Sequence, residues 1–318
     1  MNTAKRLYIK SKDTPGIFTI IILIVLLFIF SNTSKYFFTG DSLLAILLSA
    51  STVSYIAAGQ FMVLLGGQFD MSVGNVAAMG GVLYSMLAVK GWPVPLAMAV
   101  ALGFGLLSGF IAGVCVSRFN TNAFITTFAQ LQIYRGILFV LTGGSTISVN
   151  PNPAFRFIGT YKVFGFLQMP IVIMIVIFVL FWFILKFTKL GRAVYCVGNN
   201  AEAAKISGIN VPRTITFAFL MTGFFAALSG VVFASRVNSG QPNLGATYAL
   251  DTIAASVIGG TSMAGGKGNI WGAFIGILVV YVIQNGLIMS GVDSYYHYII
   301  TGLIMFFAVL AQTEKTKK

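Results

Sequence analysis

Charged residues are scarce in this sequence. They make up 8% of the 318 residues, whereas a soluble globular domain carries roughly 25%. Histidine occurs once and cysteine twice, so the composition predicts neither a metal site nor a disulfide framework. No two carboxylates stand at a spacing suited to acid–base catalysis. We therefore expect a protein that is not an enzyme, binds no metal and needs no cofactor.

Apolar residues dominate instead, at 57% of the chain. They gather in runs of about 20 residues, the length that a helix needs to cross a hydrocarbon layer about 30 Å thick. Backbone groups in lipid must bond within their own segment, so we expect an all-α polytopic membrane protein that forms a single domain over residues 1–318. Ten spans are predicted, at 16–31, 43–65, 72–89, 93–116, 123–141, 164–187, 214–234, 248–259, 270–289 and 295–311.

The eighth predicted span, 248–259, is shorter than the others. It has too few residues to cross a full bilayer as one straight helix. We expect it to start earlier or to be a broken or re-entrant element. The total is therefore about ten spans, with nine or eleven as alternatives.

The net charge of +13 is distributed by side of the membrane. With a cytoplasmic N-terminus, fourteen Lys and Arg fall inside, five fall outside, and only Arg135 lies within a span. This is the positive-inside pattern of a membrane protein. It indicates topology rather than a nucleic-acid surface. An even number of spans then leaves both termini in the cytoplasm.

The largest predicted cytoplasmic loop is 186–213, and it contains the sequence NAEAAKISG. Asn199 or Asn200 can cap a short helix there, Glu202 favours its first turn, and Gly208 suits the position just beyond its end. The helix is either a capped surface element or a docking element for a cytoplasmic partner. The pattern alone favours neither reading.

Residues 259–269 read GGTSMAGGKGN and suggest a phosphate-binding loop. The Walker A pattern requires glycine where Thr261 stands and a hydroxyl residue where Gly268 stands, so a nucleotide site is not expected. We predict a flexible connection whose glycines are Gly259, Gly260, Gly265, Gly266 and Gly268. A similar glycine-rich pattern occurs at 63–83, so segments 63–83 and 256–278 show weak internal sequence similarity.

Few polar residues lie in or near the spans. Asp70 and Ser72 compete to cap the third span, or they mark broken backbone that lines a cavity. Arg135 either snorkels outward or pairs with Asp251, which would lower the cost of both charges. We take Asp70, Ser72, Arg135 and Asp251 as candidates for a translocation pathway.

At this point the chain resembles the permease subunits of ribose-type sugar ABC importers, a group that extends to autoinducer and nucleoside permeases. The resemblance runs over nearly the whole chain, in order. The stretches that carry it are LLGGQFDMSVGNVAAMGG (64–81), FNTNAFITTFAQLQIYRGILFVLTGG (119–144), TKLGRAVYCVGNNAEAAKISGINVPR (188–213), ASRVNSGQPNLGATYALDTIAASVIGGTSMAGGKGNIWG (234–272) and QNGLIMSGV (284–292).

The resemblance implies that the 186–213 loop couples the permease to an ATPase subunit. The family's E-A-A-x-x-x-G element matches Glu202, Ala203, Ala204 and Gly208, with Arg192 in the same loop, although INVPR replaces the I-x-L-P part of the fuller motif. It also implies a second permease subunit, an extracytoplasmic sugar-binding protein and a place in the bacterial inner membrane. The loops 142–162 and 235–248 are either connectors or the landing face for that external protein.

Two other classes of protein are alternatives to the importer permease. An ion-coupled secondary transporter works without an ATPase and usually carries ionisable groups at mid-membrane. No carboxylate lies at the centre of a predicted span, which counts against this alternative. A receptor-like or structural membrane protein that moves nothing fits the dense glycine packing less well.

Overall fold

The computed structural model describes residues 17–150 and 152–293, together with 295–296, 299–300, 302–303 and 306. Helices account for most of this chain, and the strands are only two residues long each. The longer helices are α2 (Ile17–Thr33), α3 (Gly40–Leu65), α4 (Val73–Val89), α5 (Val94–Arg118), α6 (Ala123–Thr142), α8 (Met169–Phe187), α11 (Val211–Val237), α12 (Tyr248–Ile258) and α13 (Ile270–Met289). The short elements are β1 (Ile147–Ser148), α7 (Pro153–Thr160), β2 (Lys162–Val163), β3 (Leu167–Gln168), α9 (Lys189–Asn199), α10 (Ala201–Ile206) and β4 (Ser239–Gly240).

Six of the described helices are long and apolar enough to cross a membrane. They are α3, α5, α6, α8, α11 and α13, and the shorter apolar helices are α2, α4 and α12. Three of them begin at a capping residue: the side chains of Thr39, Asn122 and Asn269 accept hydrogen bonds from the first turns of α3, α6 and α13. Such caps satisfy backbone N–H groups that a helix leaves without an intrahelical partner.

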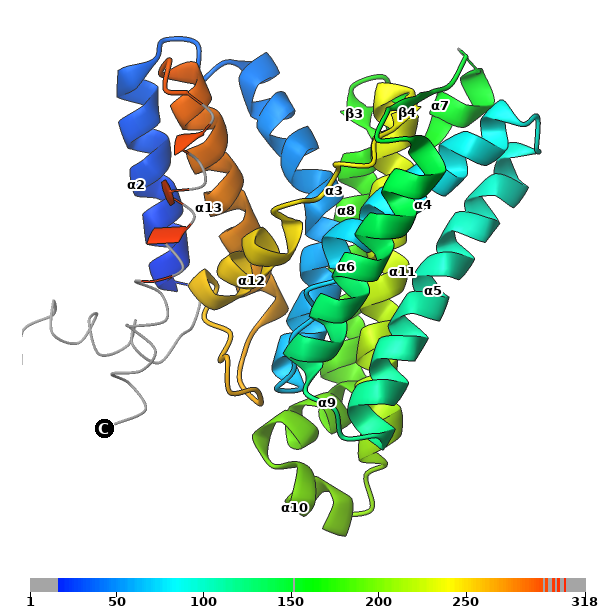
Figure 1. Cartoon of the computed structure of the whole chain (residues 1–318). Coiled ribbons are helices and arrows are strands. Elements are labelled where there is room, and N and C mark those ends of the chain that lie inside the picture. Colours follow the sequence, from blue (N-terminus) through cyan, green and yellow to red (C-terminus); the bar gives the residue numbers. More distant parts are fainter. Residues whose placement is uncertain are drawn as a thin grey trace, which may run out of the picture.

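The centre of the molecule is α11, which packs against α3, α4 and α5 (Figure 1). Glycines allow these helices to approach closely, since a Cβ atom added at Gly223 would lie 2.2 Å from the carbonyl oxygen of Gly105. A Cβ atom at Gly230 would lie 1.8 Å from the carbonyl oxygen of Ala77. Small residues at helix contacts are the usual basis of helix association in membranes. The predicted role of the glycines in close packing therefore holds for α11 and its neighbours.

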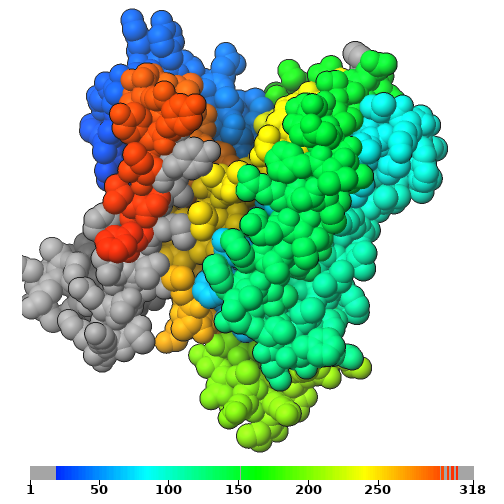
Figure 2. All heavy atoms as spheres, in the orientation of Figure 1, coloured from blue at the N-terminus to red at the C-terminus, as the bar shows by residue number. Residues whose placement is uncertain are grey.

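The connecting segments gather at two opposite ends (Figure 1). At one end, α9 and α10 project below the spanning helices, and Figure 2 shows them as a separate knob. At the other end, β1 pairs with β4 and β2 pairs with β3, both antiparallel, and α7 packs against α11. The loops that the sequence assigned to opposite sides of the membrane thus lie at opposite ends of the molecule.

Within the residues that the structure describes, the helices given above occupy nine of the ten segments predicted as spans. The span predicted at 164–187 starts later, at Met169, because residues 162–168 form the β2–β3 hairpin. Phe164 and Gly165 turn this hairpin with φ angles of 53° and 80°, which no helix accommodates. The eighth segment is indeed short, with 11 residues in α12. The tenth, 295–311, and the N-terminal lysines lie largely outside the described residues, so the total of ten spans and the position of the termini remain predictions.

Candidate functional site

The short helix predicted in the 186–213 loop is present as α10. The side chain of Asn200 accepts a hydrogen bond from the Ala203 backbone N–H at 2.9 Å, which confirms Asn200 as its cap. Gly208 follows the helix with a φ of +82°. The backbone N–H of Ile209 then donates to the carbonyl oxygen of Ala204 at 3.0 Å, which closes the C-terminal end. Both ends of this six-residue helix are thereby fixed by the local sequence.

Not all of the residues predicted to dock an ATPase are exposed on α10. Ala204 is buried, at 4% exposed, and belongs to the core cluster of the chain itself. Its small side chain lets α10 pack onto the rest of the chain. Glu202 and Ala203 are exposed, and Ile206 is 88% exposed. Ile206 was not singled out from the sequence, although an apolar residue in a polar loop is a usable signal.

Arg192 lies on α9, the helix that leads into α10. Its side chain is exposed. The start of α9 is capped by Thr188, whose hydroxyl accepts a hydrogen bond from the Gly191 backbone N–H at 3.2 Å. A Cβ atom at Gly191 would lie 2.4 Å from the Cα atom of Leu185, so the glycine lets α9 turn back onto the end of α8.

The glycine-rich segment 259–269 packs closely against α9 and the end of α3. The backbone N–H of Gly266 donates to the carbonyl oxygen of Leu65 at 2.8 Å. A Cβ atom at Gly198 on α9 would lie 1.9 Å from that same oxygen and 2.6 Å from the nitrogen of Gly266. We call this three-way contact of Leu65, Gly198 and Gly266 the glycine clamp.

The other glycines of this segment serve the same close packing. Gly260, Gly265 and Gly266 have φ angles of 88°, 85° and 69°, which side chains rarely adopt. A Cβ atom at Gly259 would lie 2.2 Å from the carbonyl oxygen of Gly272 at the start of α13. The segment predicted as a flexible connection is therefore a tightly fitted one, and its composition is explained without a phosphate.

Two further contacts join this segment to its neighbours. The Tyr195 hydroxyl on α9 donates to the carbonyl oxygen of Gly268 at 3.0 Å. Burial raises the pKa of Tyr195 above its ordinary value, so the phenol keeps the proton that it donates. A Cβ atom at Gly265 would lie 2.8 Å from the Cα atom of Gly67. The two glycine-rich stretches that resemble each other in sequence thus pack against each other.

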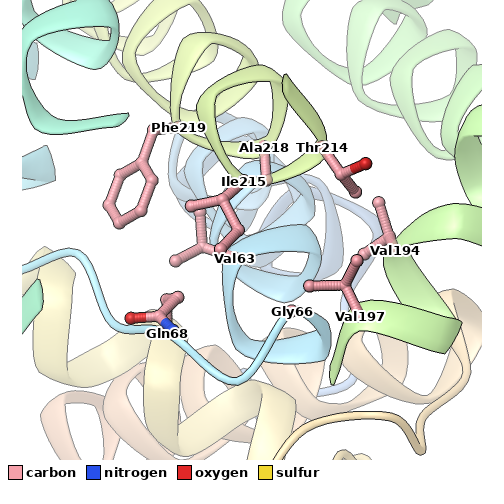
Figure 3. A pocket seen from close by; sticks show the side chains of 9 residues that line it. All are labelled: Val63, Gly66, Gln68, Val194, Val197, Thr214, Ile215, Ala218 and Phe219. Carbon is pink, nitrogen blue, oxygen red and sulfur yellow. The ribbon is translucent and has the colours of Figure 1, made fainter. Parts of the chain in front are cut away.

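A very small pocket, with a volume of about 10 Å³, lies where α9 meets α3 and α11. Figure 3 shows the side chains around it, which come from α3, the segment after it, α9 and α11. The lining residues are Val63, Gly66, Gln68, Val194, Val197, Thr214, Ile215, Ala218 and Phe219. Val194 and Val197 are buried here, so α9 is held by apolar packing as well as by the glycine clamp.

Asp70 and Ser72 lie together in the buried segment between α3 and α4. The Asp70 Oδ1 atom accepts hydrogen bonds from the Ser72 backbone N–H at 2.8 Å and from the Ser72 hydroxyl at 2.6 Å. Ser72 begins α4 but makes no side-chain cap to it. The next anchor is Thr127 on α6, whose hydroxyl accepts from the Met71 backbone N–H at 3.0 Å. Asp70 therefore shapes the entry into α4, and its role in a pathway remains a prediction.

Arg135 and Asp251 do not form the pair considered from the sequence. Asp251 is 2% exposed and accepts a hydrogen bond from the Thr247 hydroxyl at 2.7 Å. Arg135 is exposed on α6, and its guanidinium carbon lies 5.9 Å from the centre of the Phe139 ring. Asp251 thus lies in the interior of the chain, whereas Arg135 lies on its surface.

At the opposite end of the molecule, side-chain contacts hold α7 against α4 and α11. Phe155 of α7 is fully buried and stacks on Tyr84, with ring centres 4.3 Å apart. The Ser235 hydroxyl donates to the Phe155 carbonyl oxygen at 2.7 Å and accepts from the Gly159 backbone N–H at 2.8 Å. The 142–162 loop is thus fixed to the end of α11. Within the described residues no group of His, Cys, Asp and Glu is placed to hold a metal ion.

Comparison with known proteins places the chain in a family. A family model described as "Branched-chain amino acid transport system / permease component" matches residues 42–309. The ribose import permease protein RbsC of Haemophilus influenzae is 40% identical over 294 residues, which cover 92% of this chain and 91% of that protein. The corresponding proteins of Escherichia coli K12 and Bacillus subtilis are 36% and 35% identical, and each alignment covers more than 90% of both chains. No solved structure matches the chain. The chain therefore belongs to this family of transport-system permease components, the membrane subunits of ABC importers.

Proposed function

We propose that this chain is the permease of an ATP-driven importer that moves ribose or a similar neutral sugar. The observation that carries the proposal is its 40% identity to a ribose import permease over 294 residues. The proposal includes a bacterial inner membrane location and an external binding protein that delivers the sugar. The relatives offer no support for the alternative of an ion-coupled carrier.

The proposed docking element for the ATPase subunit is the exposed surface of α10. Glu202, Ala203 and Ile206 are exposed on this helix, which belongs to the knob in Figure 2. Ile206 is 88% exposed beside a carboxylate, which suits an apolar anchor and a charge contact in one small interface. Gly208 ends this helix, and Arg192 is exposed on α9, the helix that leads into it.

The proposed route for coupling runs through α9 and the glycine clamp. Movement of α10 displaces α9, because α9 ends at Asn199 and α10 begins at Ala201. The clamp joins α9 to the end of α3 and to the segment between α12 and α13. These contacts are backbone to backbone and leave little room for independent movement, so closure of the ATPase is transmitted to three helices at once.

The proposed translocation surface is the polar stripe of α6. Gln132 and Arg135 are exposed on this spanning helix. Only 22% of the apolar stretch of α6 is buried inside the chain, so most of this helix is open to its surroundings. Exposed polar and charged groups at membrane depth usually face a water-filled cavity or another protein chain. We assign this stripe to the face shared with a second permease subunit, which a single chain leaves open.

The proposed topology keeps ten spans and cytoplasmic termini. It is supported by the Lys and Arg count and by the gathering of α9, α10 and the 259–269 segment at one end (Figure 1). In this topology the β1–β4 pair and α7 face the binding protein.

The sugar specificity is tested by uptake in cells whose own ribose import has been deleted. The permease is expressed with its ATPase and binding protein, and labelled ribose uptake is measured against excess unlabelled sugars. The proposal expects ribose to compete fully and a dicarboxylate not to compete. Uptake selective for a doubly charged anion, abolished by Arg135→Gln, would contradict the assignment of a neutral sugar.

A further inference from the structure

An open groove lies where the end of α8 meets α9 and the start of α13. Its cavity volume is about 480 Å³. Its lining includes Trp182, Lys186, Tyr195, Gly268, Asn269 and Trp271. The groove is distinct from the exposed surface of α10 and from the polar stripe of α6.

The groove contains aromatic and basic side chains, which are typical of protein segments at the membrane–water interface. The chain has three tryptophans, and two of them, Trp182 and Trp271, line this groove. Tryptophan is enriched where hydrocarbon gives way to lipid headgroups. Trp182 lies in the last turns of the spanning helix α8, and Trp271 lies at the start of the spanning helix α13. Both therefore stand at the level of the headgroups.

Lys186 supplies a positive charge at the rim of the groove. Its ammonium nitrogen lies 5.2 Å from the centre of the Trp182 ring and 5.3 Å from that of Phe187. Among the described residues the lining contains no carboxylate, so this charge has no acidic neighbour from that part of the chain within the groove. The Asn269 side chain uses its oxygen to accept from the Trp271 backbone N–H at 3.0 Å, which leaves its amide N–H groups as donors. Donors of this kind suit a phosphate.

The groove is open to lipid along α8. The exposed apolar side chains of Val179, Leu180 and Phe183 follow one side of that helix towards Lys186. A lipid that lies along this side brings its headgroup to the groove while its acyl chains stay against α8. A free anion makes no use of the aromatic and apolar part of the lining.

We propose that this groove binds the phosphate headgroup of an anionic phospholipid, with Lys186 as the charged contact and the two tryptophans as its walls. The bound lipid fills the space between α8 and α13, beside α9. It therefore lies next to the proposed coupling route without forming part of it.

The test uses the purified full-length permease with Trp92→Phe, so that the remaining tryptophans both line the groove. The protein is reconstituted into vesicles of phosphatidylcholine, and its fluorescence is quenched by brominated phosphatidylglycerol or brominated phosphatidylcholine. One basic residue near a membrane surface contributes about 1 kcal/mol, so we expect about fivefold preferential quenching by phosphatidylglycerol. Lys186→Gln is expected to abolish the preference, and Lys186→Arg to keep it. Lys189→Gln, an exposed lysine outside the groove, is the matched control and is expected to keep it.

Several results would overturn the proposal. Equal quenching by the two lipids, or an unchanged preference in Lys186→Gln, contradicts a headgroup site at Lys186. Equal loss in Lys186→Gln and Lys189→Gln indicates general surface charge. Displacement of the lipid effect by inorganic phosphate at constant ionic strength indicates a free anion site. Intact lipid preference with lost ATPase binding in Lys186→Gln assigns the groove to the protein partner. None of these results bears on whether the chain transports a sugar.

Discussion

Ile206 is the residue on which the proposed docking surface depends most. Its apolar side chain is 88% exposed on a helix whose neighbouring Ala204 is buried. The sequence NAEAAKISG predicted the helix and its caps, but not which of its residues face outward. That depends on how α10 rests on the rest of the chain, which no local pattern encodes. Ala204 therefore reports on the packing of α10, and Ile206 is the better position for testing the partner.

Ile206→Ser is predicted to weaken ATPase binding. Burial of an isoleucine side chain at an interface contributes about 1.5–3 kcal/mol, so its loss lowers affinity at least about tenfold. The measurement is co-purification of the ATPase with tagged permease at a series of concentrations. Phe164→Ser removes an equally exposed apolar residue, 86% exposed, at the opposite end, and should leave ATPase binding intact. Wild-type affinity for Ile206→Ser would remove α10 from the interface.

Gly198→Ala is predicted to disrupt the glycine clamp. The added methyl group would lie 1.9 Å from the carbonyl oxygen of Leu65, and backbone atoms must move to admit it. Overpacking of this kind typically costs about 1–3 kcal/mol. The measurement is the thermal unfolding temperature in detergent, which should fall. Gly103→Ala is the matched control, because a Cβ atom there meets nothing within 4 Å, and it should leave the temperature unchanged or slightly raised.

The sequence predicted the positions of the helices better than it predicted which segments pack against each other. Long apolar runs predicted α3, α5 and α11. Asn199 or Asn200 was predicted to start α10, and the structure shows that Asn200 is the cap. The 259–269 segment was predicted as flexible because glycine is permissive, yet its glycines are there for close backbone contact. Sequence alone cannot distinguish these two uses, since the partner of Gly266 is Leu65, about 200 residues earlier in the chain.

Asn200→Ala is predicted to loosen α10. Loss of an N-cap costs about 1 kcal/mol, and α10 has only six residues over which to compensate. Hydrogen exchange of the 200–208 segment should become faster, while exchange in α11 stays unchanged. Asn200→Asp keeps an acceptor at the cap and should restore protection. Unchanged exchange in Asn200→Ala would show that packing of Ala204, rather than the cap, holds the helix.

The polar stripe of α6 makes a second prediction for an element. A cysteine at Gln132 should react with a small, water-soluble thiol reagent in membranes, because we assign this position to a water-filled path. A cysteine at Ile133 is the matched control: it lies at the same depth, is also exposed, at 57%, and points to another side of α6. The background carries Cys115→Ala and Cys196→Ser. Equal reactivity at the two positions would contradict the assignment.

At the scale of the whole molecule, the proposed topology places the two ends on opposite sides of the membrane. Cysteines at Thr33 and Ser148 should then react with an impermeant reagent from outside, and one at Ser207 should react only after the membrane is opened. The same background without native cysteines is used. Outside labelling at Ser207 would overturn the inference from the distribution of Lys and Arg.

The central claim is that this chain imports a sugar by coupling to an ATPase through α10. The most direct measurement is uptake of labelled ribose into proteoliposomes that contain the permease, its ATPase and its binding protein, with ATP supplied to the ATPase side. We predict uptake that requires all three proteins and ATP. Ile206→Ser should strongly reduce this uptake while the permease remains folded and inserted. Uptake by the permease alone, driven by an ion gradient without ATP, would contradict the account.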